Sequence, residues 1–185
     1  MILTKNTSNQ IKTIHNYFDL RHPKRYSTLQ FPGYRHIPGM TPHPVFDQQG
    51  HSFGKSQLEV IEISKNNWSI NEPYLFAIDL FNYGYFWESH EHLEDFWKVS
   101  SKLQEKSFIQ GLIQLSAAYL KWVQGLDEGF HKLSSKGLKK ILLAQKLSPN
   151  VFGIDIISFI DANTKFLNSN DLTNSNPPVI ELNNE

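Results

Sequence analysis

The chain has 185 residues with 18 basic and 18 acidic side chains, so it carries no formal net charge that would attract the phosphates of nucleic acids. It contains no cysteine, which excludes disulfides, thiolate zinc sites and cysteine nucleophiles and fits a reducing compartment. Because the chain has no apolar run near the roughly 20 residues of a membrane span and no signal-length run at its start, we expect a cytoplasmic protein that binds neither membranes nor nucleic acids.

Residues 1–72 are expected to form an irregular extension. Five prolines lie between positions 23 and 44, and each removes a backbone donor and disfavours helix, so no helix can run through this region. The run SQLEVIEIS alternates apolar and polar residues, and a strand there is left open. The extension also carries His36, His43 and His51. A long stretch without regular structure is usually functional or disordered, and we favour a functional role.

Residues 73–167 are predicted to form an all-α domain, an antiparallel bundle of about five helices that the extension wraps. Five segments carry apolar residues at helical spacing, and the breaks between them hold Asn, Ser, Pro and Gly, which favour caps and turns. Residues 168–185 are polar and of low complexity, so we expect a flexible tail. The helical segments are PYLFAIDLF (73–81), GYFWESHEHLEDFWK (84–98), KSFIQGLIQLSAAYLKWV (106–123), EGFHKLSSKGLKKILLAQKL (128–147) and GIDIISFIDANTKFL (153–167).

The segment WESHEHLEDFW gathers acidic, histidine and aromatic side chains on one predicted helix. With an advance of about 100° per residue, His90 and Glu94 fall within the aromatic stripe that faces the core. Glu88, His92 and Asp95 fall on the opposite side and are expected to face solvent. A carboxylate and an imidazole on a buried face are costly unless they are paired, so His90 and Glu94 need partners.

The next predicted helix offers such partners. Gln110 and Gln114 lie one turn apart on one face, and the small residues beside them would let a neighbouring helix approach closely. A short connection favours antiparallel packing of the two helices. We therefore expect a buried polar network in which His90, Glu94 and the bordering Glu91 face the two glutamines.

The two helices contain the motifs FNYGYFWESHEHLEDFWK and FIQGLIQLSAAYLKW. Together these motifs resemble the signature of the domain of unknown function 309 family, small helical proteins without an established activity. The resemblance covers residues 74–147, and PGMTPHPVFDQQGHSFG is similar to the amino-terminal extension of longer members. It implies an all-helical fold and no function. Because the pattern includes Glu88, it implies that this side chain faces the preceding loop or a partner chain. The matching residues are Phe81, Asn82, Gly84, Glu88, His90, Glu91, Glu94, Trp97, Gln110, Gly111 and Gln114.

The HEHLE helix also offers a candidate metal site. His90 and Glu94 lie four residues apart on one helical face, and Glu91 follows the histidine as the general base does in His-Glu-x-x-His zinc proteases. Glu94 replaces the second histidine of that motif, so a further ligand would have to come from elsewhere. His43, Asp47 and His51 in the extension are the candidate donors. A divalent metal such as zinc is one alternative, and a hydrogen-bonded network without a cofactor is the default interpretation.

Two functional classes stay open. The favoured class is a non-enzymatic interaction module, whose exposed aromatic residues such as Trp68, Tyr85 or Phe96 bind a protein partner or a second copy of the chain. The alternative is a metal-dependent hydrolase or another small-molecule enzyme with its site at the HEHLE helix and Glu91 as the candidate catalytic residue.

The extension is expected to lie across the HEHLE helix. Its prolines lower the entropy lost on ordering, and its aromatic residues provide surface to bury. We predict that it brings His43 or His51 within hydrogen-bond or shared-metal distance of His90 or Glu91.

Overall fold

The computed structural model describes residues 18, 22–56, 59–146, 148–169, 171–172 and 177–183. It contains the five predicted helices packed against one another, so the prediction of an all-α domain is confirmed. A short two-stranded sheet was not predicted. The elements are η1 (Trp68–Ile70, a turn of 3-10 helix), α2 (Glu72–Asn82), α3 (Phe86–Val99), α4 (Leu103–Val123), α5 (Asp127–Ala144), β1 (Asn150–Val151), β2 (Ile154–Asp155) and α6 (Ile156–Leu167).

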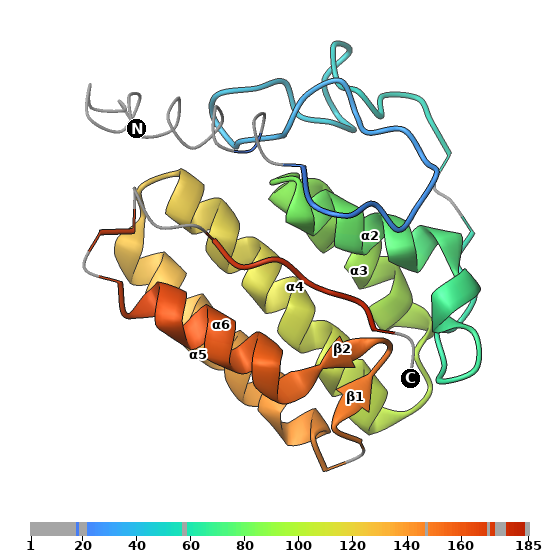
Figure 1. Ribbon diagram of the computed structural model, residues 1–185. Helices are drawn as coiled ribbons and strands as arrows, with labels where there is room; N and C mark the ends of the chain where they lie inside the picture. Colours follow the sequence, from blue (N-terminus) through green and yellow to red (C-terminus); the bar gives the residue numbers. More distant parts are fainter. Residues whose placement is uncertain are drawn as a thin grey trace.

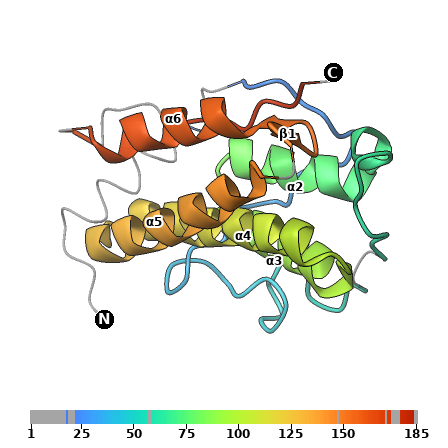
Figure 2. The same cartoon turned by 90° about the horizontal axis from the view of Figure 1, so that it is seen from below.

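The helices pack in the order of the chain. α2 packs on α3, α3 on α4, and α4 on α5, while α6 packs on α5. Short connections make neighbouring helices antiparallel. α6 lies on one side of the row formed by α3, α4 and α5, and the cyan part of the extension lies on the other side (Figure 1 and Figure 2). The extension itself is irregular, and none of the described residues of SQLEVIEIS forms a strand.

Local sequence explains where two of the helices begin. At the start of α2, the side chain of Asn71 accepts a hydrogen bond from Tyr74 N at 3.2 Å, and Pro73 fits the first turn, where no backbone donor is needed. At the start of α6, Asp155 accepts a hydrogen bond from Ser158 N at 2.7 Å. Both caps satisfy helix N–H groups that have no partner within the helix.

α4 supplies the centre of the core. Phe108, Leu115 and Tyr119 are each at most 1% exposed. A Cβ built at Gly111 would lie 2.9 Å from the carbonyl oxygen of Gly137 on α5, and a Cβ at Gly137 would lie 2.9 Å from the oxygen of Gly111. The two facing glycines therefore let the backbones of α4 and α5 touch. Even this long helix does not meet the length and apolarity of a membrane span, and neither does any other helix within the described ranges.

α2 carries an aspartate within an otherwise apolar run. Asp79 is fully buried. Its carboxylate accepts hydrogen bonds from Arg25 Nε at 2.8 Å, Ser27 N at 2.9 Å and Tyr26 N at 3.0 Å. Two turns earlier, Glu72 accepts a hydrogen bond from the Ser27 hydroxyl at 3.0 Å. Because a buried carboxylate is costly unless it is paired and hydrogen-bonded, these contacts hold the extension on α2.

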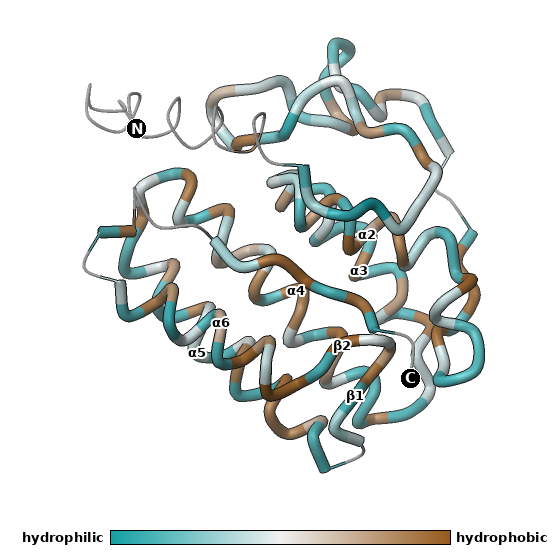
Figure 3. Tube along the Cα trace, in the orientation of Figure 1, coloured by the Kyte–Doolittle hydropathy of each residue, from teal (hydrophilic) through white to brown (hydrophobic). Residues whose placement is uncertain are grey.

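Residues 177–183 pack against the helices, whereas polar composition indicated a flexible tail. Asn82, the last residue of α2, exchanges two hydrogen bonds with the backbone of Ile180, at 2.7 and 2.9 Å. Leu182 donates its N–H to the hydroxyl of Tyr26 at 2.9 Å. Figure 3 shows an apolar stretch of this segment in front of α4. Ile180 and Leu182 are buried, although the composition of the tail as a whole is polar.

The β1–β2 hairpin was also not predicted. Its turn places Phe152 at a φ of 52° and Gly153 at a φ of 84°. A Cβ at Gly153 would lie 2.5 Å from the ring of Trp68, so η1 packs directly on this turn. Ile154 of β2 forms a bridge with Leu182 of the carboxy-terminal segment. Strands of two residues are too short to show an alternating pattern in a sequence.

We predict that Gly111→Ala destabilises the protein. The added Cβ would meet the carbonyl oxygen of Gly137 at 2.9 Å and Cγ1 of Ile141 at 2.7 Å, and overpacking of this kind costs about 1–3 kcal/mol. Gly129→Ala, in the first turn of α5, is the matched control, because its Cβ would meet only the flexible side chain of Lys121 at 3.3 Å. Urea unfolding followed by circular dichroism compares the two variants. Equal free energies of unfolding would contradict the close backbone contact.

Candidate functional site

Glu88, in the first turn of α3, is buried beneath the extension. Its side chain is 3% exposed, so the prediction from the helical wheel that it faces solvent was wrong. Its Oε1 accepts the backbone N–H of His36 at 2.9 Å and lies 2.9 Å from Nε2 of His51. Its Oε2 is buried and has no hydrogen-bond partner among the described residues. The wheel failed because the extension covers the side of α3 that faces away from the bundle.

His51 connects Glu88 to Ser52. Its Nδ1 lies 2.9 Å from the Ser52 hydroxyl oxygen. A carboxylate oxygen accepts hydrogen bonds, so in the tautomer that satisfies both contacts Nε2 carries the proton toward Glu88 and Nδ1 accepts the hydroxyl proton of Ser52. Tyr34 supports this arrangement, since its ring centroid lies 4.7 Å from that of His51 and its hydroxyl accepts the backbone N–H of His51 at 3.3 Å. The result is a continuous chain of carboxylate, imidazole and hydroxyl.

A cavity of about 570 Å³ lies between the extension and helices α2 and α3. Its volume falls within the range of small-molecule sites. Ser52, His51 and Glu88 all line it, so the hydrogen-bonded chain borders a space that can hold a ligand. Aromatic and ionisable side chains complete much of the wall, namely Phe31, Phe76, Trp87, Glu91, His92 and Asp95.

Burial shifts the ionisation of two groups in this wall. Removal from solvent raises the pKa of the Glu91 carboxyl. A carboxyl whose pKa is shifted toward neutral pH is suited to exchange protons. Burial lowers the pKa of His92, whose ring packs edge-on against Phe76 with centroids 5.3 Å apart. His92 is therefore half-buried, and the prediction that it faces solvent was wrong. Asp95 is only partly exposed and pairs with Lys98 at 2.9 Å.

His90, Glu91 and Glu94 form a group whose ligand atoms all lie within 4.8 Å of one another. Nδ1 of His90 lies 3.3 Å from the carbonyl oxygen of Ile113 on α4, and its Nε2 lies 3.3 Å from Glu94 Oε1. A histidine that donates one ring N–H to a carbonyl presents its other nitrogen to a metal ion. The structure thus brings together two predicted metal ligands, His90 and Glu94, and the predicted catalytic residue Glu91.

The two glutamines lie on α4 but do not bond to Glu94. The Glu94 side chain is 40% exposed and pairs with His90. Within the described part of the chain, no hydrogen bond joins it to Gln110 or Gln114, and Oε1 of Gln114 is buried without a partner. α3 and α4 approach each other at His90, whereas Glu94 stays at the solvent edge of the helix pair.

The extension lies across α3, and its histidines contact residues other than those expected. His51 reaches Glu88, and His43 packs against Trp87 with ring centroids 5.6 Å apart. Nδ1 of His43 accepts the backbone N–H of Val45 at 3.2 Å. Neither histidine belongs to the group of three candidate metal ligands on α3.

Asp79 and Ser52 carry no motif that singles them out in the sequence. For Asp79 a signal exists, because a single acid within an apolar helical segment needs a buried partner. For Ser52 the only local feature is the adjacent histidine. The contact of that histidine with Glu88 joins residues 37 positions apart, which no local pattern reveals.

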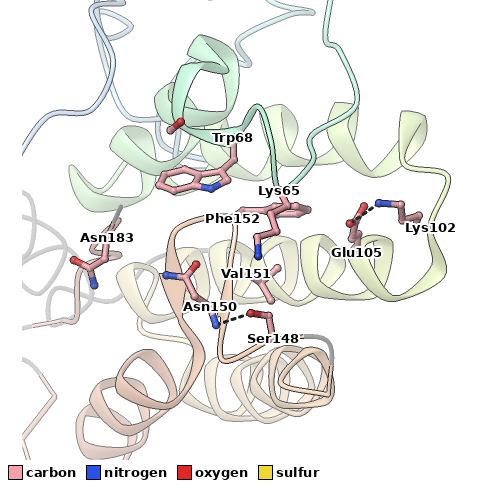
Figure 4. A pocket seen from close by; sticks show the side chains of 10 residues that line it. Lys65, Trp68, Lys102, Glu105, Ser148, Asn150, Val151, Phe152 and Asn183 are labelled. Atoms are coloured by element: carbon pink, nitrogen blue, oxygen red, sulfur yellow. Dashed lines mark hydrogen bonds and ion pairs between the residues drawn. The ribbon is translucent and has the colours of Figure 1, made fainter. Parts of the chain in front are cut away.

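A second cavity, of about 660 Å³, lies between η1 and the β1–β2 hairpin. Figure 4 shows the ring of Trp68 and the side chain of Lys65 close to Phe152 in this cavity. Its Lys102 and Glu105 pair with each other at 3.0 Å. None of its described side chains has a buried polar atom without a partner. The cavity beneath the extension, which holds Glu88, is therefore the stronger candidate for a ligand site.

We predict that Glu88→Ala loosens the extension. The substitution leaves the His36 N–H and the His51 Nε2–H without an acceptor, at a cost of roughly 1–3 kcal/mol. Hydrogen–deuterium exchange should rise in residues 34–52 while α4 and α5 stay protected. Asp95→Ala, in the same cavity wall, is the matched control and should leave the exchange of the extension unchanged. The same exchange pattern in both variants would contradict the role of Glu88.

Comparison with known proteins places the central helices in a family. The family model described as Domain of unknown function (DUF309) matches residues 74–133. The match runs from α2 into α5 and includes all of α3, with Glu88, His90 and Glu91. No curated protein and no solved structure matches the chain. The chain therefore contains a DUF309 domain at residues 74–133, with an amino-terminal extension before it.

Proposed function

We propose that this protein is an enzyme that transfers an acyl group of a small molecule to water, with Ser52 as its nucleophile. The observation that supports this function is the hydrogen-bonded chain Ser52–His51–Glu88 at the wall of a cavity. An activated serine requires a base within hydrogen-bond reach and an acidic group that orients this base. This function is a form of the small-molecule enzyme alternative, in which the catalytic group includes Glu88, one turn before Glu91 on α3.

The proposed roles follow from the hydrogen bonds. The hydroxyl oxygen of Ser52 bonds to the carbonyl carbon of the substrate while Nδ1 of His51 takes the hydroxyl proton. Nδ1 then gives this proton to the leaving group, which departs. Water then attacks the carbonyl carbon of the acyl-enzyme and gives a proton to the same nitrogen. The bond between this carbon and the Ser52 oxygen breaks, the acid leaves, and the proton passes from Nδ1 to the Ser52 oxygen. Glu88 holds the Nε2–H and stabilises the imidazolium that forms in each step. Glu91 lines the same cavity as a further carboxylate.

The interaction module receives less support. Phe96 is only 1% exposed and belongs to the core. Tyr85 stacks on Phe31 of the extension, with ring centroids 5.0 Å apart. Trp68 is half-exposed and borders the second cavity. A protein partner or a second copy of the chain stays a prediction, but much of the aromatic surface expected to bind it is covered by the chain itself.

Labelling with a fluorophosphonate tests the nucleophile. Ser52 should attack the phosphorus and displace fluoride, and mass spectrometry should find the label on this residue. His51→Ala should slow the labelling roughly 100-fold or more, because it removes the base. Ser56→Ala is the matched control, since Ser56 lines the same cavity and should not be needed for labelling. An unlabelled Ser52, or an unchanged rate in His51→Ala, would contradict the proposal.

The group His90, Glu91 and Glu94 favours a second candidate function, a metal-dependent hydrolase. Imidazole nitrogen and carboxylate oxygen are ligands that zinc accepts, and catalytic zinc sites keep one position open for water. The carbonyl oxygen of Ile113, 3.3 Å from Nδ1 of His90, would fix the orientation of this ring, as backbone carbonyls do for many metal-binding histidines. A bound zinc ion would supply a water of lowered pKa as the nucleophile.

Zinc titration tests this second function. Competition with a chromophoric chelator should give one zinc ion per chain, and His90→Ala should weaken its binding by roughly tenfold or more. His131→Ala is the matched control, because His131 is an exposed histidine on α5. Zinc binding that His90→Ala leaves unchanged would exclude the group on α3 as its site.

A further inference from the structure

We propose that the ligand of the cavity between the extension and α3 carries an ammonium group on an apolar body. This inference rests on the proposed function, because it names the substrate class of the same site. Two features of the cavity support it: the charge of its wall, and a buried oxygen of Glu88 that has no partner among the described residues.

The charge of the wall favours a cation. Glu88, Glu91 and Asp95 line the cavity, and Lys55 is the one lysine or arginine among its described lining residues. Lys55 is exposed, and among the described residues no ion pair joins it to these carboxylates. Asp95 is partly neutralised by Lys98, whereas Glu91 makes no hydrogen bond with any described residue. Carboxylates in a partly enclosed site raise the local concentration of cations.

Glu88 provides the second feature. Its Oε1 takes both of its hydrogen bonds, from His36 and His51, while its Oε2 is buried and unpaired. A carboxylate can accept hydrogen bonds at both oxygens, and a buried acceptor without a partner is costly. Because Oε2 has almost no accessible surface and Glu88 lines the cavity, a small shift of this side chain would let an N–H group of a ligand reach and satisfy the oxygen.

The aromatic wall indicates the rest of the ligand. Phe31, Phe76 and Trp87 line the same cavity and offer apolar surface for a hydrocarbon or ring. Small-molecule sites typically combine such surface with a few polar groups that fix the orientation of the ligand. A ligand with an apolar body and one ammonium group matches both parts of the wall. An anionic ligand would meet like charges and is disfavoured.

Three probes that share a phenyl ring test the charge. Phenethylamine, 2-phenylethanol and 3-phenylpropanoate are titrated into the full chain and followed by ligand-observed NMR. Phenethylamine should bind roughly tenfold or more tightly than the alcohol, as one charge-assisted hydrogen bond provides, and the carboxylate should not bind. A capped Gly-Lys-Gly peptide separates a free amine from a lysine of a protein and should bind more weakly than phenethylamine. Equal binding of amine and alcohol, preference for the carboxylate or the peptide, or no binding at all would overturn the inference.

Variants locate the binding site. Glu91→Gln removes a charge from the wall without removing a described hydrogen bond, and it should weaken phenethylamine binding roughly tenfold. Glu88→Gln should weaken it as well, but that variant also alters the bond to His51, so Glu91→Gln decides the question. Glu128→Gln, an exposed position on α5, is the matched control and should bind as the wild type does. Full affinity in Glu91→Gln would overturn the inference.

The two proposals fail in different ways. Selective amine binding by a chain whose Ser52 is not labelled would overturn the acyl-transfer function and keep the cation site. A labelled Ser52 without any preference for the amine would keep the function and overturn the substrate class.

Discussion

Carboxylates at the junction between the helices and the extension hold the two parts of this protein together. Glu72, Asp79 and Glu88 come from α2 and α3, and each accepts at least one backbone N–H of the extension. An acid removed from water needs donors, and an irregular chain has donors to give because it forms neither a helix nor a sheet. Each part thus supplies what the other lacks. The helices could not bury Asp79 and Glu88 alone, and the extension would have no fixed path without the three acids.

The same junction determines where the chemistry lies. Glu88 and Glu91 come from α3, whereas His51 and Ser52 come from the extension, and the cavity forms where the two parts meet. Glu88 therefore has a structural and a chemical role at once, because the oxygen that holds the backbone of His36 also orients the imidazole of His51. The helical domain alone would keep the acids and lose the imidazole and the hydroxyl.

Apolar periodicity predicted the five helices because each one has a face in the core. Apolar periodicity does not predict the buried residues of α3 correctly, because this helix is covered by the bundle on one side and by the extension on the other. A helical wheel assumes one buried face, so it sent Glu88 and His92 to solvent although both are shielded. The pairing of His51 with Glu88 depends on the path of a loop anchored at Asp79, and no local pattern of residues contains that path. Family resemblance pointed to Glu88 where the wheel did not.

The carboxy-terminal segment determines when the fold can be completed during synthesis. Its Leu182 donates a hydrogen bond to the hydroxyl of Tyr26, and the backbone N–H of Tyr26 is bonded to Asp79. Asn82 in turn uses its side-chain amide as a neighbouring strand would use its backbone, and thereby holds Ile180. The extension leaves the ribosome before the helices, yet one of its anchors is synthesised after all of them. A nascent chain therefore cannot complete the enclosure of α2 until translation has passed Leu182.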